Sequence, residues 1–206
     1  MGPVDPLVLL AFLPAGLALN LTPGADMLFC IGQGLRAGPR AASLASAGIA
    51  AGSFVHTGLA GLGLGALVAA HPGLFDVIRW VGVAYLLWLA VTSLRRRPPA
   101  GGTPRRGHPF RDGLLVNLTN PKVILFVLAF VPQFVDPERG QVLLQFLIFG
   151  AMLSLGGLVI NALAGIFAGG AGRRAAGSER VNRVLGWITA GIFGVLALRL
   201  AAMQRS

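Results

Sequence analysis

Long stretches of this chain carry no charged side chain, and that feature constrains its fold more than any other. Residues 41–75 and 140–172 contain no Asp, Glu, Lys or Arg, and neither do residues 6–25. About 20 apolar residues in a helix are enough to cross the hydrocarbon core of a membrane. Each of these stretches is therefore long enough to form a membrane span.

The overall composition points to the same class of protein. Hydrophobic residues make up 55% of the chain, charged residues only 12%, and the mean hydropathy is +0.75. An ordinary soluble domain has about 25% charged residues. A soluble fold of 206 residues could not bury so much apolar surface. A disordered chain would contain far fewer hydrophobic residues. The composition predicts an all-α integral membrane protein.

Six apolar blocks alternate with the charged clusters. We predict one transmembrane helix from each block, near residues 6–34, 41–70, 74–94, 112–135, 141–170 and 184–203. The segment 95–111 is rich in Pro, Gly and Arg and is predicted to be a basic linker. It would join a first three-helix repeat, 1–94, to a second, 112–206, within one membrane domain.

The arginines predict how these helices are oriented. Twelve of the sixteen arginines fall in the connections between spans one and two, three and four, and five and six. Basic residues concentrate in cytoplasmic loops, so these connections should be cytoplasmic and both termini outside. The same rule accounts for the net charge of +10 without a nucleic-acid partner.

A short polar motif occurs once in each half of the chain. Asn20-Leu21-Thr22 is followed directly by Pro23, and Asn117-Leu118-Thr119 is followed one residue later by Pro121. Three spans, an odd number, separate the two copies, so the halves should be inverted relative to each other. Two inverted repeats are the arrangement of many secondary transporters.

The motif residues also interrupt a helix. A continuous helix over 6–35 would be about 45 Å long, more than the hydrocarbon core requires. Pro23 and Pro121 each remove a backbone donor, and Gly24 relaxes the chain. Such breaks are tolerated at membrane depth only inside protein or beside a cavity. We therefore expect the first and fourth helices to be broken around a shared site; a simple proline kink without a ligand is the alternative.

Two charged side chains lie beside these interruptions, and ionisable groups inside spans are costly unless they have a function. Asp26 could bind a substrate ammonium or the coupling proton. Lys122, the only lysine, could hold a substrate carboxylate together with free amides after Pro121. Both ends of a zwitterion would then be bound. The alternative is that Asp26 and Lys122 pair with each other as a structural lock.

Short polar side chains complete the predicted site. Asparagines and threonines at the breaks can bind substrate or only cap helix ends. His56, central in its span, is a second candidate for proton coupling, or else a packing histidine. For Asn161 an interhelical hydrogen bond is the expected role. The predicted substrate-binding set is Asn20, Thr22, Pro23, Gly24, Asp26, Asn117, Asn120, Pro121 and Lys122.

Other chemistries find little support in the sequence. Cys30 is the only cysteine, so neither a disulfide nor a redox pair can form within the chain. His56, His71 and His108 fall in different regions, which argues against a metal site. No membrane-embedded catalytic motif is present, and we expect neither an enzyme nor a cofactor.

Two segments resemble a known family. NLTPGADML at 20–28 and FRDGLLVNLTNPKVILFVLAFVPQFVDP at 110–137 are similar to the signature segments of the LysE/RhtB family of amino-acid exporters, although that family usually has a second proline where Ala25 stands. The resemblance implies a multi-pass protein of a bacterial-type cytoplasmic (inner) membrane. It further implies export of amino acids or related metabolites by proton antiport. The two helix breaks add the hypothesis of alternating access around a midplane site.

Two alternatives to amino-acid export stay open at this stage. The chain could export a metal cation, although its few intramembrane carboxylates argue against that function. It could also be a membrane interaction or lipid-handling protein without transport activity. Glycines four residues apart, as in 48–52 and 165–169, allow close helix packing and are compatible with a homodimer.

Overall fold

A computed structural model describes residues 2–70, 107–169 and 179–202, together with some positions between 77 and 91. Within these residues the regular structure is entirely helical, which confirms the predicted all-α class. The elements are α1 (Pro6–Leu21), α2 (Ala25–Ala37), α3 (Pro39–Ala70), α5 (Pro109–Leu118), α6 (Pro121–Ala129), the 3-10 helices η1 (Val131–Phe134) and η2 (Pro137–Arg139), α7 (Val142–Gly169) and α9 (Glu179–Ala202).

Both predicted interruptions are present. The first expected span consists of α1 and α2, with a bend of 53° between them. The fourth consists of Pro109–Leu118 and Pro121–Phe134, with a bend of 54°. The expected helices 41–70 and 141–170 are α3 and α7, while the expected helix 184–203 begins five residues earlier, as α9. Most of the expected span 74–94 and most of the linker 95–111 lie outside the described residues.

Some of the described helices, alone or as bent pairs, are long and apolar enough to span a membrane. Among the described helices, Val142–Ala168 is long and apolar enough to cross a membrane by itself, with a mean hydropathy of 2.2. The two bent pairs would raise the number to three if each is one span. The full count of six spans and their inverted repeat remain predictions.

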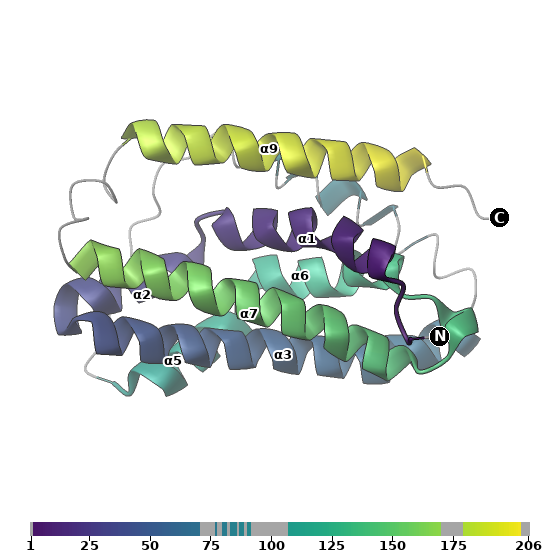
Figure 1. Cartoon of the computed structure of the whole chain (residues 1–206), viewed down its shortest axis with the longest axis horizontal. Coiled ribbons are helices and arrows are strands. Elements are labelled where there is room, and N and C mark those ends of the chain that lie inside the picture. Colours follow the sequence, from purple (N-terminus) through teal and green to yellow (C-terminus); the bar gives the residue numbers. More distant parts are fainter. Residues whose placement is uncertain are drawn as a thin grey trace.

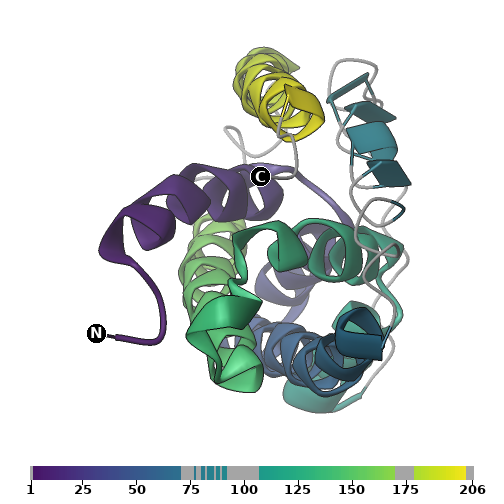
Figure 2. The same cartoon turned by 90° about the vertical axis from the view of Figure 1, so that its right-hand side faces the viewer.

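The helices run along the long axis of the molecule (Figure 1). α3 makes its most extensive contacts with α7 and α5, and α2 packs against both α7 and α3. α9 lies at the periphery, where it packs against α1 (Figure 2). The start of α1 and the end of α9 lie at the same end of the molecule (Figure 1).

Glycines bring α3 and α5 into backbone contact. A Cβ atom at Gly48 would collide with the carbonyl oxygen of Phe110, and one at Gly113 would collide with that of Ala45. Small residues permit this close approach of membrane helices. The seam holds the second interruption against the middle of α3.

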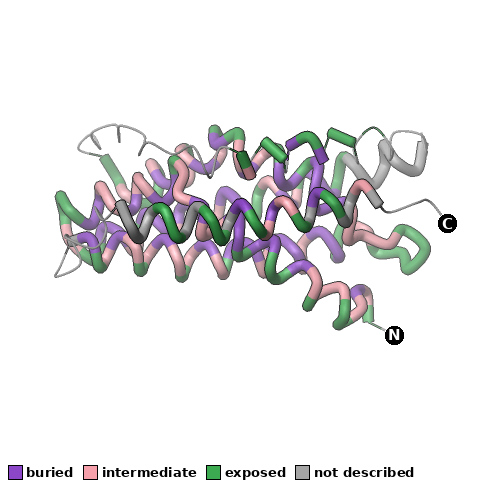
Figure 3. The backbone as a smooth tube through the Cα atoms, turned by 90° about the horizontal axis from the view of Figure 1, so that it is seen from above, coloured by how far each residue is buried: buried purple, intermediate pink, exposed green. Residues whose placement is uncertain are grey.

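Polarity is distributed in the opposite way to that of a soluble protein. α7 exposes a stripe of large apolar side chains at four-residue spacing, namely Leu155, Val159, Leu163 and Phe167. The exposed positions follow the outer sides of the helices and the buried ones face their neighbours (Figure 3). Several polar side chains are buried instead, including Asp26, Gln33, Asn117, Gln145 and Asn161. An apolar exterior with polar side chains buried between the helices suits a hydrocarbon environment.

A cluster of phenylalanines fills the interior on one side of the interruptions. The ring of Phe12 in α1 lies 4.8 Å from that of Phe149 in α7, measured between ring centroids, and 6.4 Å from that of Phe126 in α6. Phe130 and Phe134 extend the cluster towards η1. This packing fixes α1, α6 and α7 relative to one another between the interruptions and the end of the molecule formed by η1 and η2.

Candidate substrate site at the two helix interruptions

The first interruption arises because Pro23 and Gly24 cannot continue α1. α1 ends at Leu21, and the backbone N–H of Thr22 closes it on the carbonyl of Ala18 over 3.0 Å. The Thr22 hydroxyl donates to the same carbonyl. Gly24 then begins α2 in an extended conformation without a side-chain cap. The helix direction changes here, and the C-terminal carbonyls of α1 turn towards the interior.

The second interruption is capped from within the chain. Asn120 is the N-cap of α6, and its Oδ1 accepts a hydrogen bond from the backbone N–H of Lys122 over 3.0 Å. Asparagine is among the best N-cap residues because its side chain satisfies an otherwise unpaired amide. The capping interpretation of Asn120 is thus confirmed. The first amide after Pro121 is not free, contrary to the expectation that it could bind a carboxylate.

The two interruptions meet through the side chain of Lys122. Its Nζ donates hydrogen bonds to the carbonyl oxygens of Leu19, over 2.7 Å, and Thr22, over 2.8 Å. These carbonyls belong to the C-terminal end of α1, where the helix dipole favours a cation. Gly24 leaves room for the lysine side chain, since a Cβ there would lie 3.3 Å from Nζ. Pro23 and Pro121 therefore lie in one shared region, as the sequence predicts.

Asp26 has a different partner. Its Oδ2 accepts a hydrogen bond of 2.9 Å from Nδ2 of Asn117, and that nitrogen also lies 3.2 Å from the Ser53 hydroxyl oxygen. Asp26 is only 8% exposed, and its Oδ1 has no hydrogen-bond partner among the described residues. The ion pairs found in the described part of the chain do not join Asp26 to Lys122.

The interruptions border a small polar cavity. Its volume is about 10 Å³, roughly the room that one water molecule needs. Residues of α1, α2, α3, α6 and α7 line the cavity, and Lys122 belongs to α6. The polar residues that line it are Asn20, Thr22, Asp26, Ser53, Lys122 and Asn161. This cavity is too small to hold an amino acid.

The remaining predicted residues lie around this cavity. Asn20 donates from Nδ2 to the carbonyl of Leu153 over 3.0 Å, and its amide lies against Gly156 and Gly157 of α7. His56 lies with its Nε2 3.3 Å from the carbonyl oxygen of Asn117, the residue whose side-chain amide contacts Asp26. It borders a second, apolar cavity of about 460 Å³ between α3 and α6.

Sequence reasoning missed two contributions to the site. Ser53 lines the cavity and contacts Asn117; its position three residues before His56 on α3 was the available signal, because such residues share a helix face. Tyr85 donates from its hydroxyl to the carbonyl of Lys122 over 2.8 Å. Asn161, for which an interhelical hydrogen bond was expected, is buried and lines the cavity.

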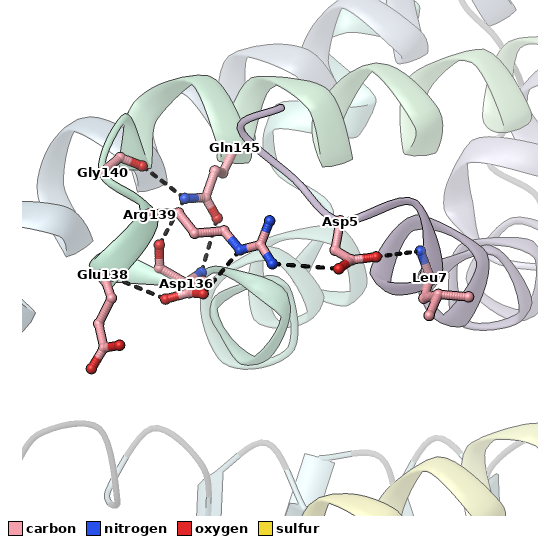
Figure 4. Close-up of polar contacts among 7 residues, drawn as sticks. All are labelled: Asp5, Leu7, Asp136, Glu138, Arg139, Gly140 and Gln145. Atoms are coloured by element: carbon pink, nitrogen blue, oxygen red, sulfur yellow. Dashed lines mark hydrogen bonds and ion pairs between the residues drawn. The ribbon is translucent and has the colours of Figure 1, made fainter. Parts of the chain in front are cut away.

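A second polar cluster lies at the end of the molecule where α1 begins (Figure 4). The Arg139 guanidinium contacts the carboxylates of Asp136, at 3.2 Å, and Asp5, at 3.4 Å. Gln145 bonds to both the N–H and the carbonyl of Asp136 and also to the carbonyl of Gly140 (Figure 4). The cluster joins the start of α1 to η2 and α7. We call these five residues the terminal polar cluster.

Among the described residues, no three His, Cys, Asp or Glu side chains lie close enough together to bind a metal ion. The polar chemistry is concentrated instead at the interruptions. Two broken helices whose ends and charged side chains meet inside an apolar-surfaced helical protein form the type of site found in secondary transporters.

Comparison with known proteins agrees with this class. The family model of the LysE type translocators matches residues 17–204 of the chain. The chain belongs to this family. No solved structure shows significant similarity to it.

Several curated relatives carry functional names. A homoserine/homoserine lactone efflux protein of Salmonella typhi is 36% identical over 148 residues, which cover 68% of this chain and 70% of the relative. A leucine efflux protein of an Enterobacter species is 35% identical over 141 residues, 66% of this chain and 67% of the relative. A Vibrio cholerae relative, 39% identical over 69% of this chain and 72% of its own length, is described as an uncharacterised membrane protein.

Proposed function

We propose that this protein is a secondary exporter of amino acids or related small metabolites in the cytoplasmic membrane of a bacterium. The observation that carries the proposal is the meeting of the two interruptions, where Lys122 of one contacts the carbonyl end of the other beside the buried carboxylate of Asp26. The efflux functions named for two relatives favour amino acids as the substrate class. The chain would act as a transporter rather than as an enzyme.

Asp26 is the proposed partner of the substrate ammonium. Its carboxylate is held in place by Asn117 through one oxygen, while the other oxygen has no hydrogen-bond partner in the described structure. A buried carboxylate oxygen without a donor is costly, and an ammonium group supplies the donor and the opposite charge. Once the cavity opens, the side-chain ammonium of Lys122 would bind the substrate carboxylate. The backbone amide of Lys122 is not available for this, because Asn120 already caps it.

The same carboxylate is the proposed proton acceptor. If proton and substrate ammonium compete for Asp26, proton entry and substrate export become coupled, since the carboxylate cannot bind both at once. His56 is a second candidate for the proton, supported by its contact with the carbonyl of Asn117, the residue that holds Asp26. Proton antiport would thus depend on a short chain of residues from α3 through α5 to α2.

Alternating access would open the cavity to one side of the membrane at a time. The repeats 1–94 and 112–206 would rock against each other around the interruptions, as the halves of inverted-repeat transporters do. The small volume of about 10 Å³ agrees with an occluded state between the two open ones. The last turn of α2 and the first turns of α3 and α5 carry Arg36, Arg40 and Arg111, and we assign that end to the cytoplasm.

The test is export from proteoliposomes that contain the purified protein and an internal panel of labelled amino acids, including L-homoserine and L-leucine. An imposed proton gradient should accelerate the release of at least one of them by the unmodified protein. Asp26→Asn should abolish this release at unchanged protein abundance. Glu138→Gln removes an exposed carboxylate at one end of the molecule and is the matched control.

The outcomes separate the candidate functions. Release of an amino acid that requires Asp26 supports the proposal, whereas full activity of Asp26→Asn refutes the role of this carboxylate. Flux of a divalent cation but of no amino acid would favour a cation exporter. Absence of any solute flux from liposomes that contain correctly folded protein would favour a lipid-handling or interaction protein.

A further inference from the structure

The contact between Lys122 and the end of α1 suggests where a ligand binds. We propose that the carbonyls of Leu19 and Thr22, together with Asp26, form an ammonium subsite that Lys122 occupies when no substrate is present. A substrate amine would displace the lysine from this subsite. The inference deepens the proposed function and rests on it, because the ligand is taken to be a primary amine such as the α-ammonium of an amino acid.

The carbonyls at the end of α1 require a cation or another donor. The last carbonyls of a helix have no partner within the helix, and burying them unpaired is costly. Those of Leu19 and Thr22 are satisfied by Nζ of Lys122 over 2.7 and 2.8 Å. An ammonium group has three donors and no acceptor, so it fits two carbonyl oxygens and still has a third N–H to donate.

Asp26 is an independent indication of the same ligand. It is more than nine-tenths buried, it lines the same cavity as Leu19, Thr22 and Lys122, and its Oδ1 accepts no hydrogen bond in the described structure. Asp26 is thus a further acceptor in the cavity that Lys122 borders, and it becomes available to a substrate amine once the lysine has left.

The cavity is too small for the Lys122 side chain and a substrate to occupy the subsite at the same time. The cavity of about 10 Å³ cannot hold an amino acid while Lys122 remains in place. The lysine stem passes close to Gly24, where a Cβ would lie 3.3 Å from Nζ and 3.6 Å from Cε. Displacement would therefore release the contact that joins the start of α6 to the end of α1. Substrate binding and separation of the two interruptions would then be one event.

Lys122 is the only lysine in the chain, which permits a direct measurement. Protein labelled with [15Nζ]lysine in lipid nanodiscs should give a single side-chain ammonium signal. Titration with L-homoserine or L-leucine, whichever is transported, should shift or remove that signal. N-acetylated forms of the same compounds lack the ammonium and should leave it unchanged. A signal that does not respond to a saturating transported amino acid would overturn the displacement.

Truncation of the lysine provides a second test. In Lys122→Ala the carbonyls of Leu19 and Thr22 lose their donor, so n-butylammonium, which has the four carbons and the ammonium of a whole lysine side chain, should raise the melting temperature of this variant. The unmodified protein should respond less, because n-butylammonium must compete there with Lys122 and has no carboxylate to bind the displaced lysine. The isosteric variant Lys122→Met, which retains the bulk of the stem, should respond less than Lys122→Ala.

The results distinguish this inference from the proposed function. Equal responses of the unmodified protein and Lys122→Ala to n-butylammonium, or no response of a folded Lys122→Ala, would overturn the subsite even if the protein exports amino acids. A selective response of Lys122→Ala would support the subsite whatever the export assay gives. Failure of export concerns only the proposed function.

Discussion

Asn117 in α5 donates a hydrogen bond from Nδ2 to Oδ2 of Asp26 in α2 over 2.9 Å, although 91 positions separate the two residues in sequence. The same nitrogen lies 3.2 Å from the hydroxyl oxygen of Ser53 in α3. One fully buried amide thus orients the carboxylate proposed to bind substrate and joins three helices around it.

The first prediction concerns this amide. Asn117→Ala removes the donor to Asp26 and leaves a second carboxylate oxygen unpaired, at a cost of about 1–3 kcal/mol. If Asp26 binds the substrate, transport should fall by roughly 5- to 150-fold, since 1.4 kcal/mol corresponds to a factor of ten. Initial rates of release from proteoliposomes at equal protein content provide the measurement.

The control for this variant is Ser43→Ala. Ser43 is close to the start of α3 and makes only a local hydrogen bond to the carbonyl of Pro39. This change should leave the transport rate within a factor of two of that of the unmodified protein. Full activity of Asn117→Ala would show that the orientation of Asp26 by this amide is not needed for transport.

The second prediction concerns the glycine seam between α3 and α5. Gly48→Ala would place a methyl group against the carbonyl of Phe110, a backbone atom that cannot move away locally. Such overpacking costs about 1–3 kcal/mol or more, so the melting temperature in detergent should fall. Gly63→Ala on the same helix adds its methyl group where no atom lies within 4 Å.

Gly63→Ala is therefore the matched control for Gly48→Ala. It should be neutral or stabilising by up to about 1 kcal/mol, because alanine has the higher helix propensity. A loss of stability of the same size in both variants would mean that flexibility of α3, rather than close packing on α5, is the property that the glycines provide.

Local features of the fold could be predicted from the sequence because their cause is local. Pro23 and Pro121 lack a backbone N–H, so each interruption follows from the residue itself, and both occur where expected. Likewise, Asn120 caps the helix that begins at the next residue. The charge-free stretches that became α3 and α7 needed no knowledge of their neighbours either.

Long-range partners could not be predicted in the same way. Lys122 was assigned to a substrate carboxylate, but in the structure it contacts carbonyls about 100 positions earlier in the chain. Asn117 was considered a capping or substrate-binding residue, yet it holds Asp26. Such pairings depend on how α1, α2 and α5 pack in three dimensions, and a single sequence contains no direct record of that packing.

The third prediction compares two residues of the terminal polar cluster. Gln145 is 1% exposed and makes three hydrogen bonds to backbone groups of Asp136 and Gly140. Gln145→Leu would leave these groups unpaired, and we expect a loss of at least about 2 kcal/mol in unfolding free energy. Arg139→Gln removes ion pairs of a half-exposed side chain, worth about 0–1 kcal/mol.

Thermal unfolding in detergent at low and high salt distinguishes the two effects. The Arg139→Gln difference should shrink as salt screens the charges, whereas the Gln145→Leu difference should persist. A larger effect from Arg139→Gln than from Gln145→Leu would show that the ion pairs, rather than the buried amide, hold the start of α1 to α7.

The fourth prediction tests the orientation in the membrane. Arg40, at the start of α3, and Glu138, in η2, are exposed and belong to opposite ends of the molecule (Figure 1). The only native cysteine, Cys30, is fully buried, so it should react slowly with a polar reagent. A membrane-impermeant maleimide added to intact cells should label Glu138→Cys quickly, and Arg40→Cys only after the membrane is permeabilised. Because eleven arginines would remain on the proposed cytoplasmic side, Arg40→Cys should not invert the protein. Reversed labelling would place the arginine-rich end outside, in which case amino acids would enter the site from the opposite side of the membrane to the one proposed.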